Sequence, residues 1–425
     1  MGLGLSKSLL FAVLITISAV AQAGPMTFGP EWELTSADLQ EAPEFHGGPA
    51  PNCPEKQAQM LFVEKIRERC QKLDCTVTGK PGKWDTDFTV QFTDGWWFKV
   101  SYDPAVVEIT AKPSTLEELT AREALLDDAI FATGAELGLK PKADSSAHVN
   151  FGVNSAFDGD PELFLRFFVD YANHPDLTMG SLGYDDPENS PPLALLKQQQ
   201  RDALQEIIRE FYTGQFKTVA ALARAIQDRV YTSSYNPDWG GATHYQAIGL
   251  KTVNRTDLTK QDAPEELRSV FSQLSVEQFV LVGRLLEGRI NYLKTVKTPI
   301  VYTGTTRADF TASDLKNRFY IYVTEAGMNY ADYKSLLPLS VQKAALSPFL
   351  TDNASIMARL KDLENFTDLF DASPWIKERA RQTIASAQAV KNPTALEIVA
   401  RVKALITKGC EALLMGSAMR AGLAH

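Results

Sequence analysis

The chain has 425 residues, of which 44% are hydrophobic and 22% are charged, so its composition is that of an ordinary globular protein and excludes a disordered chain. Its formal net charge of -9 argues against a general binder of nucleic acid or of anionic membranes, because such proteins need a basic surface.

The first residues have the pattern of a secretory signal peptide. Lys7 precedes an apolar run at 9–20, and Ala21-Gln22-Ala23 supplies a small-x-small cleavage pattern. The run is shorter than the roughly 20 apolar residues that a membrane span needs. We therefore predict that residues 1–23 are removed, that no stable membrane span remains, and that the mature protein is periplasmic or secreted.

Four cysteines fit an oxidising compartment but are too few to build a disulfide scaffold. They are Cys53, Cys70, Cys75 and Cys410. We expect Cys53 to pair with Cys70 or Cys75, although four cysteines allow three complete pairings. No CxxC motif or Cys/His cluster favours a structural zinc site.

The N-terminal part is strand-rich, with β-branched and aromatic runs separated by turn residues. Strands are predicted near 28–34, 86–92, 96–102 and 106–110. A helix should begin after Pro113, where Ser114 and Glu117 have the spacing of a capping box, and should run to about Gly138. A strand that carries His148 should follow.

Beyond residue 160, helical spacing of apolar residues dominates. Helices are predicted at 161–172, 193–211, 219–230 and 264–294, and from 330 to the end with a break at 392–393. Two strand-like segments interrupt them, at 244–253 and 318–323.

The predicted fold class is α+β, with helices on one face of an antiparallel sheet and the other face free for a site. No repeat or long linker marks a domain boundary. We predict an α+β domain with a helical insertion at 24–330, and a helical C-terminal region at 331–425 packed on it.

Strand alternation predicts a polar surface on that free face. Glu31 and Glu33 project to the same side of one strand, because Trp32 points the other way. His148 and Asn150 do the same on a second strand.

On a third strand, Glu108 is expected on the open side, since Val107 and Ile109 supply the buried side. Oxygen-rich sites of this kind favour hard cations. The candidate ligands of one or two Mg²⁺ or Mn²⁺ ions are Glu31, Glu33, Glu108 and His148.

Asn150 would orient a ligand, and Arg255, Lys251 or Arg318 would supply positive charge for phosphate. Simpler interpretations remain open: solvated glutamates on an edge strand, a structural histidine, and a salt-bridged face that includes Arg318.

Three segments, in chain order, resemble the successive motifs of the amidoligase family. They are Phe28–Leu34, Asp103–Pro113 and His148–Val153. The family belongs to the glutamine synthetase and glutamate-cysteine ligase superfamily of carboxylate-amine ligases. The resemblance covers about the first third of the mature chain, and it implies a curved antiparallel sheet of glutamine synthetase-like type that binds Mg²⁺-ATP.

The resemblance also implies a reaction, in which a carboxylate is activated as an acyl phosphate and attacked by an amine. Glu31 and Glu33 match the metal-binding acids of the first strand, Glu108 the acid after the Asp-Pro turn, and His148 the residue near metal and nucleotide. The family's late strand carries an acid shortly before an arginine, whereas Lys316–Phe319 keeps Arg318 and has no acid.

Three functions follow as hypotheses. The first is an ATP- and Mg²⁺-dependent ligase acting on a small-molecule or peptide substrate. Because ATP is scarce outside the cytoplasm, the second is a secreted, non-catalytic protein of the same fold that binds a peptide, amino acid or protein partner. The third is a metal-dependent hydrolase that uses the same carboxylates to activate water.

Overall fold

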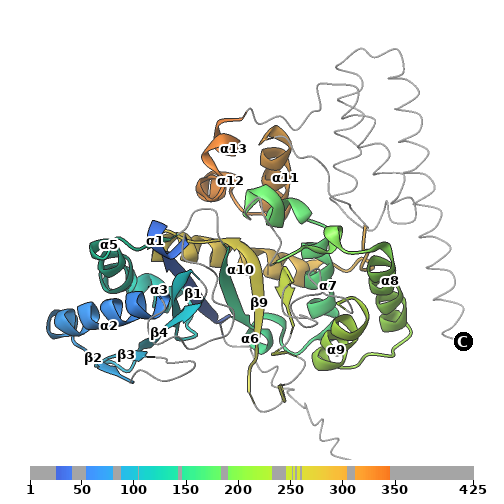
Figure 1. Cartoon of the computed structure of the whole chain (residues 1–425). Coiled ribbons are helices and arrows are strands. Elements are labelled where there is room, and N and C mark those ends of the chain that lie inside the picture. The colour runs from blue at the N-terminus through green and yellow to red at the C-terminus, as the bar shows by residue number, and fades with distance from the viewer. Residues whose placement is uncertain are drawn as a thin grey trace, which may run out of the picture.

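The computed structural model describes residues 25–40, 54–79, 88–103, 105–141, 146–182, 190–231, 246–250, 252–253, 256–258, 261–303 and 312–344. Within these ranges the chain forms one mixed sheet-and-helix body around a continuous hydrophobic core (Figure 1). The predicted signal peptide, Cys53, Cys410, Lys251, Arg255 and the region 345–425 lie outside the described residues.

The sheet is antiparallel at every strand pair and runs in the order β2-β3-β4-β5-β1-β7-β9-β8, with β6 paired to β1. Its strands are β1 (Phe28–Thr35), β2 (Cys75–Thr78), β3 (Phe88–Phe92), β4 (Trp97–Asp103), β5 (Val106–Ala111), β6 (Lys140–Pro141), β7 (Ser146–Gly152), β8 (Ile248–Gly249) and β9 (Pro264–Phe271).

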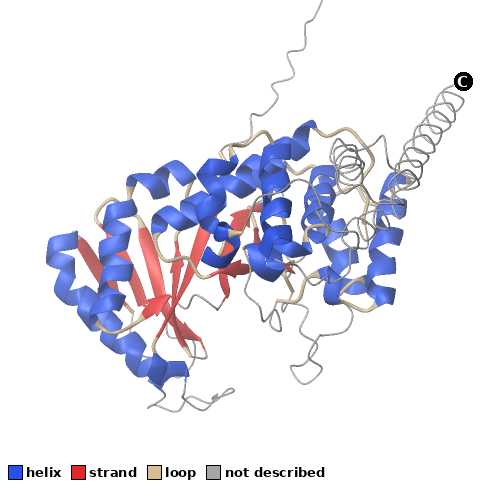
Figure 2. Cartoon of the chain, turned by 90° about the horizontal axis from the view of Figure 1, so that it is seen from above, coloured by secondary structure: helices blue, strands red, loops and turns tan. Residues whose placement is uncertain are grey.

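Helices pack along the strands, as the view from above shows (Figure 2). The longer ones are α2 (Pro54–Leu73), α7 (Pro161–Ala172), α8 (Gln198–Tyr212), α9 (Val219–Arg229), α10 (Val276–Thr295) and α11 (Ala312–Glu325). The shorter helical segments are α1 (Ala37–Gln40), α3 (Leu116–Ala121), α4 (Glu123–Leu126), η1 (Asp127–Ala132), α5 (Thr133–Glu136), α6 (Val153–Phe157), η2 (Leu177–Ser181), η3 (Leu193–Leu195), α12 (Tyr330–Tyr333), η5 (Lys334–Leu336) and α13 (Leu339–Lys343).

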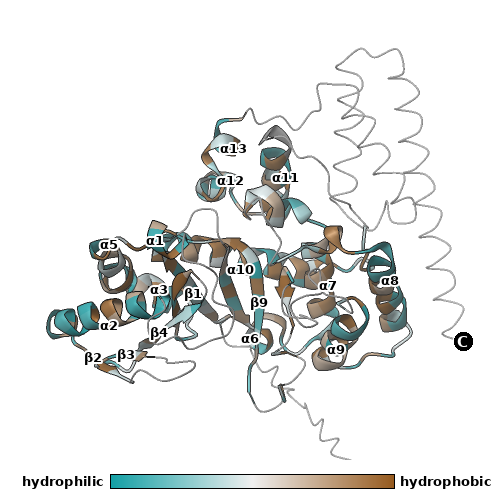
Figure 3. Ribbon diagram, in the orientation of Figure 1, coloured by the Kyte–Doolittle hydropathy of each residue, from teal (hydrophilic) through white to brown (hydrophobic). Residues whose placement is uncertain are grey.

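One face of the sheet is apolar and covered by helices. On β1, Trp32 is fully buried and lies edge-on to Phe131 and to Phe279 of α10. Its cross-strand partner Ile109 on β5 is also fully buried. Helix α7 is mainly hydrophobic, whereas α2 and α8 carry hydrophilic positions as well (Figure 3). Burial of this face leaves the alternate side chains of the same strands on the opposite face.

The four predicted N-terminal strands are confirmed within one or two residues at their described ends. The helix after Pro113 begins one residue later than predicted, because the capping box is formed by Thr115 and Glu118. Ser114 instead pairs with Phe28 through two backbone hydrogen bonds of 2.8 and 2.9 Å, so its backbone extends the sheet.

Two segment predictions were wrong in opposite directions. The segment 318–323 is part of α11, because its buried residues Leu315, Phe319 and Val323 recur every four positions. The predicted helix at 264–294 is strand β9 followed by α10, which starts at the Ser275 N-cap. Of the segment 244–253, Ile248–Gly249 forms a strand.

The cysteine pairing is corrected as well. Cys70 in the last turn of α2 is bonded to Cys75 at the start of β2, so neither can pair with Cys53. Asp74, with a positive φ of 55°, turns the chain between them.

None of the helices in the described ranges is both apolar enough and long enough to cross a bilayer.

Candidate cation-binding site

The polar face of the sheet is built from neighbouring strands whose registers bring its acids together. Glu31 of β1 lies opposite His148 of β7, and Glu33 of β1 lies opposite Glu108 of β5. Asn150 of β7 lies opposite Glu266 of β9. Four strands that are far apart in the sequence therefore contribute to one surface.

The centre of this surface is a histidine between two carboxylates. His148 Nδ1 lies 2.6 Å from Glu31 Oε1 and 3.0 Å from Glu266 Oε1. One ligand atom from each of the three side chains lies within 4.8 Å of the other two. The His148 side chain is 8% exposed, whereas the Glu31 and Glu266 side chains are 15% and 24% exposed, so a ligand can reach the carboxylates from solvent.

A β-bulge in β9 shapes this centre. Ala147 pairs with Val270 while Val149 pairs with Leu267, so Arg268 and Ser269 together lie opposite His148. The extra residue changes the alternation: Ser269 and Val270 are both buried, whereas Arg268 stays half-buried beside Glu266. Bulges of this kind bend a strand and redirect a side chain, and they are frequent next to functional sites.

Two further side chains fix the carboxylates. Asn150 Nδ2 donates to Glu31 Oε2 at 3.2 Å and to the Gly29 carbonyl oxygen at 3.3 Å. Arg268 Nη1 donates to Glu266 Oε1 at 2.8 Å. The oxygens of Glu31 and Glu266 thus have defined directions before any ligand arrives.

The charges at the centre stabilise one another. Burial alone would raise the pKa of Glu31 and of Glu266, but the charge and hydrogen bonds of His148 lower the pKa of Glu31 and, together with Arg268, lower the pKa of Glu266 to about 2. Although burial opposes protonation of His148, the charge of Glu31 and the hydrogen bonds to both glutamates raise its pKa well above the usual value. A protonated His148 therefore holds two ionised carboxylates.

Glu33 and Glu108 form the less compensated part of the face. Ser101 Oγ donates to Glu108 Oε1 at 2.9 Å. Burial raises the pKa of Glu33 to about 7, and burial together with the charge of Glu31 raises the pKa of Glu108 to about 8. The two carboxyls share a region with more negative than positive charge, which a cation would relieve.

The structure brings together five of the residues that the sequence indicated: Glu31, Glu33, Glu108, His148 and Asn150. The strand on which Arg318 was expected does not exist. Arg318 lies on α11, where its Nη1 is 3.1 Å from Asp176 Oδ1. Lys251 and Arg255 fall in the part of the chain that is not described.

Sequence reasoning missed Glu266 and Arg268, which complete the centre. The signal was present, because Glu266 and Arg268 are separated by the buried Leu267 in the same i, i+2 pattern as Glu31 and Glu33. It was hidden by the helix predicted over 264–294.

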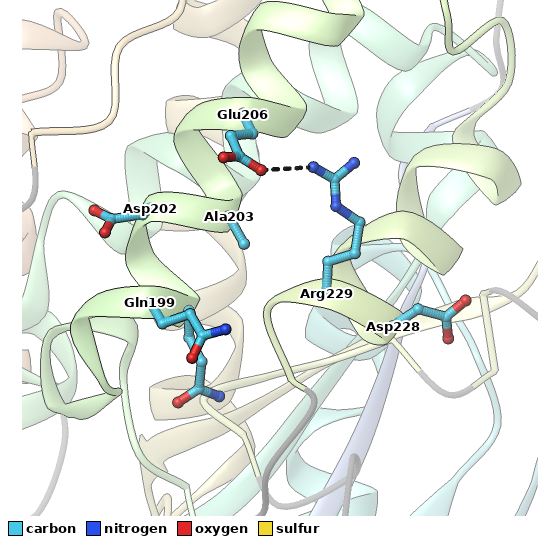
Figure 4. A pocket seen from close by; sticks show the side chains of 7 residues that line it. Gln199, Asp202, Ala203, Glu206, Asp228 and Arg229 are labelled. Carbon is cyan, nitrogen blue, oxygen red and sulfur yellow. Dashed lines mark hydrogen bonds and ion pairs between the residues drawn. The ribbon is translucent and has the colours of Figure 1, made fainter.

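A cavity of about 500 Å³ lies elsewhere, between α8 and α9 (Figure 4). It is lined by polar side chains that include Asp202, Glu206 and Asp228, and Arg229 pairs with Glu206 at 3.2 Å across it. None of the residues that line it comes from the sheet face, so the candidate site rests on the donor geometry of the strands.

Two carboxylates and an imidazole are a donor set that suits Mg²⁺, Mn²⁺ or a transition-metal ion. The four acids Glu31, Glu33, Glu108 and Glu266 outnumber the positive groups His148 and Arg268 beside them, which also fits a bound cation.

No protein-family model matches the chain, and a comparison with curated proteins gives no match.

Proposed function

We propose that the polar sheet face binds a divalent cation, Mg²⁺ or Mn²⁺, through Glu31, His148 and Glu266. The single observation that carries this proposal is the position of His148 Nδ1 between Glu31 Oε1 and Glu266 Oε1, at 2.6 and 3.0 Å. The proton on that nitrogen occupies the place where a cation would be coordinated.

On this basis we further propose an ATP-dependent carboxylate-amine ligase of the amidoligase type, with a glutamine synthetase-like sheet. A carboxylate is a poor acyl donor until it is phosphorylated, so such a site must neutralise a triphosphate and stabilise a developing anion. The cation supplies charge neutralisation when it is bound. Arg268, which lies two residues from Glu266 on the same side of β9, takes the phosphate-binding role for which the sequence offered Arg255, Lys251 or Arg318.

Glu33 and Glu108 extend the face away from His148. In the ligase proposal they hold a second cation or the positive end of an amine substrate, because the strand registers place both carboxyls beside Glu31 on the polar face. The position of Asn150 fixes Glu31 and so the orientation of the coordinating oxygens.

The second candidate is an exported protein of the same fold that binds a peptide, amino acid or protein partner without ATP chemistry. The Cys70–Cys75 disulfide favours it, because disulfides persist in oxidising compartments, where ATP is scarce. Periplasmic or secreted localisation is part of this proposal.

The test is a titration of the purified protein with Mn²⁺ or Mg²⁺, with and without ATP, followed by thermal unfolding. A ligand present at 100 times its Kd stabilises the folded state by about 2.7 kcal/mol. Glu31→Gln and Glu266→Gln should abolish the Mn²⁺ effect, whereas Glu64→Gln, at an exposed position of α2, should retain it.

The outcomes separate the candidates. Stabilisation by the cation and a further shift with ATP support the ligase. Stabilisation by the cation without an ATP effect favours the non-catalytic binder, and no cation effect in the wild type overturns the site. Affinity should also rise with pH, because the cation must displace the proton from His148.

A further inference from the structure

Glycine at position 249 is unexpected on conformational grounds. Gly249 is in β8 and pairs with Glu266 of β9, on the polar face of the sheet. Its φ is not in the left-handed region, so its backbone does not require glycine. Glycine inside a strand is less favourable than alanine, because it loses more conformational freedom on folding and packs no side chain. Another constraint must explain it.

That constraint is space beside a ligand atom. A Cβ built on Gly249 would lie 2.8 Å from Glu266 Oε2 and 3.3 Å from Glu266 Cβ. The first distance is shorter than carbon and oxygen tolerate, so the Glu266 carboxylate would have to move. Since this atom is the end of a flexible side chain, the fold can absorb the change, but the direction of the carboxylate cannot stay the same.

The direction of this carboxylate matters because its two oxygens differ in environment. Oε1 is already shared by His148 Nδ1 at 3.0 Å and Arg268 Nη1 at 2.8 Å. Oε2 is on the side of Gly249. This orientation, with Oε1 on His148 and Arg268 and Oε2 beside residue 249, is open to Glu266 because residue 249 has no side chain.

We propose that Gly249 is a positioning residue for Glu266: its missing side chain leaves the space in which the Glu266 carboxylate keeps the orientation that directs it, with Glu31 and His148, to a divalent cation. This inference rests on the cation site proposed above. It assigns a function to β8, which otherwise adds only two residues to the edge of the sheet.

The test compares Gly249→Ala with Gly288→Ala by calorimetric titration of Mn²⁺ and by thermal unfolding in EDTA. Gly288 is a matched control, because it lies in α10 and a Cβ there would also collide with the end of a flexible side chain, at Met328 Sδ. We expect Gly249→Ala to weaken Mn²⁺ binding about tenfold or more, as the loss of groups that support metal ligands does. Its Tm in EDTA should equal or exceed that of the wild type, and Gly288→Ala should bind Mn²⁺ normally.

A second variant separates positioning from general damage. Aspartate is one methylene shorter than glutamate, so Glu266→Asp withdraws the carboxylate from the added methyl group. Glu266→Asp should weaken binding in the wild-type background and restore part of it in the Gly249→Ala background.

Each result has one meaning. Unchanged Mn²⁺ affinity in Gly249→Ala overturns the positioning role and leaves the cation site intact. Weakened affinity with a lower Tm in EDTA and no rescue by Glu266→Asp also overturns it, since the substitution then damages the fold. A wild-type protein that binds no Mn²⁺ overturns the cation site itself, and the inference with it.

Discussion

In two of the described clusters, a nearly buried basic side chain lies between two carboxylates, and the clusters differ in how far solvent can reach them. On the sheet face, His148 lies between Glu31 and Glu266. Between the helices, Arg289 of α10 lies between Asp170 of α7 and Glu325 of α11.

The helical region is closed and saturated. Arg289, 3% exposed, donates to both oxygens of Asp170 at 2.9 and 2.6 Å, to Glu325 at 3.0 Å and to the Tyr322 carbonyl oxygen at 3.2 Å. Its guanidinium also lies 4.3 Å from the centre of the Tyr322 ring. Such a group uses its charge for internal contacts and ties three helices together.

The sheet face is more open to solvent. The Glu266 side chain is 24% exposed, against 13% for Asp170 and 9% for Glu325, and burial raises the pKa of the neighbouring Glu33 and Glu108 to about 7 and about 8. The comparison teaches that burial of charge alone does not identify a site. A satisfied cluster indicates a structural role, whereas an under-compensated cluster that solvent can reach indicates a ligand.

The largest predicted effect tests the structural role of the saturated cluster. Arg289→Ala should lower the free energy of unfolding by about 3–5 kcal/mol, because it leaves two carboxylates buried without their partner. Urea denaturation measures the change. The matched control is Arg284→Ala, at an exposed position of the same helix, which should stay within about 0.5 kcal/mol of the wild type. A loss below about 1 kcal/mol for Arg289→Ala would contradict the structural interpretation.

The Arg289 variant should leave the Mn²⁺ affinity of the folded protein unchanged. If affinity falls in parallel with stability, the two regions are coupled and the contrast between them is wrong.

The next effect comes from the disulfide, which belongs to neither cluster. Cys70 and Cys75 are separated by 5 positions. Closing a loop this short lowers the entropy of the unfolded chain, which stabilises the folded state by about 2 kcal/mol. The double variant Cys70→Ala/Cys75→Ala should lose about that much stability in urea and keep its cation affinity. Dithiothreitol should destabilise the wild type by the same amount and leave the variant unaffected.

The sequence predicted the part of the site that depends on strand alternation. Glu31, Glu33 and Glu108 could be placed on one face because Trp32, Val107 and Ile109 had to be buried. His148 followed in the same way. This reasoning needs only the local period of two residues and the amphipathic character of the sheet.

The rest of the site, and the secondary structure of two segments, depended on contacts that the local sequence does not determine. The run Glu265-Glu266-Leu267-Arg268 is composed of good helix formers, and its pairing with β7 overrides that preference. The pairing that brings Glu266 and Arg268 to the polar face is defined only by the register between β7 and β9. In α11 the opposite error arose, because a six-residue alternation at 318–323 also fits a helix when Leu315 is included.

The smallest predicted effect, counted per pH unit, is a pH dependence of stability to which the sheet face contributes. In EDTA, the free energy of unfolding should fall as pH rises from about 5 to 8, by on the order of 1 kcal/mol per pH unit. The folded-state pKa values of Glu33 and Glu108 are raised from 4.5 to about 7 and about 8, so between these values the folded protein holds protons that the unfolded chain has lost. As pH rises, the loss of these protons from Glu33 and Glu108 therefore favours unfolding.

His148 contributes to the pH dependence of stability with the same sign. Its raised pKa gives stability that is present below pH 6.5 and is lost as pH rises through the folded-state pKa. The double variant Glu33→Gln/Glu108→Gln should flatten the dependence, as followed by thermal unfolding in EDTA across this range. Saturating Mn²⁺ should flatten it in the wild type, because a bound cation offsets the negative charge that appears. A curve that is equally steep in the presence of Mn²⁺ would mean that no bound cation neutralises the carboxylates on this face. The distinction between the two clusters would then be wrong.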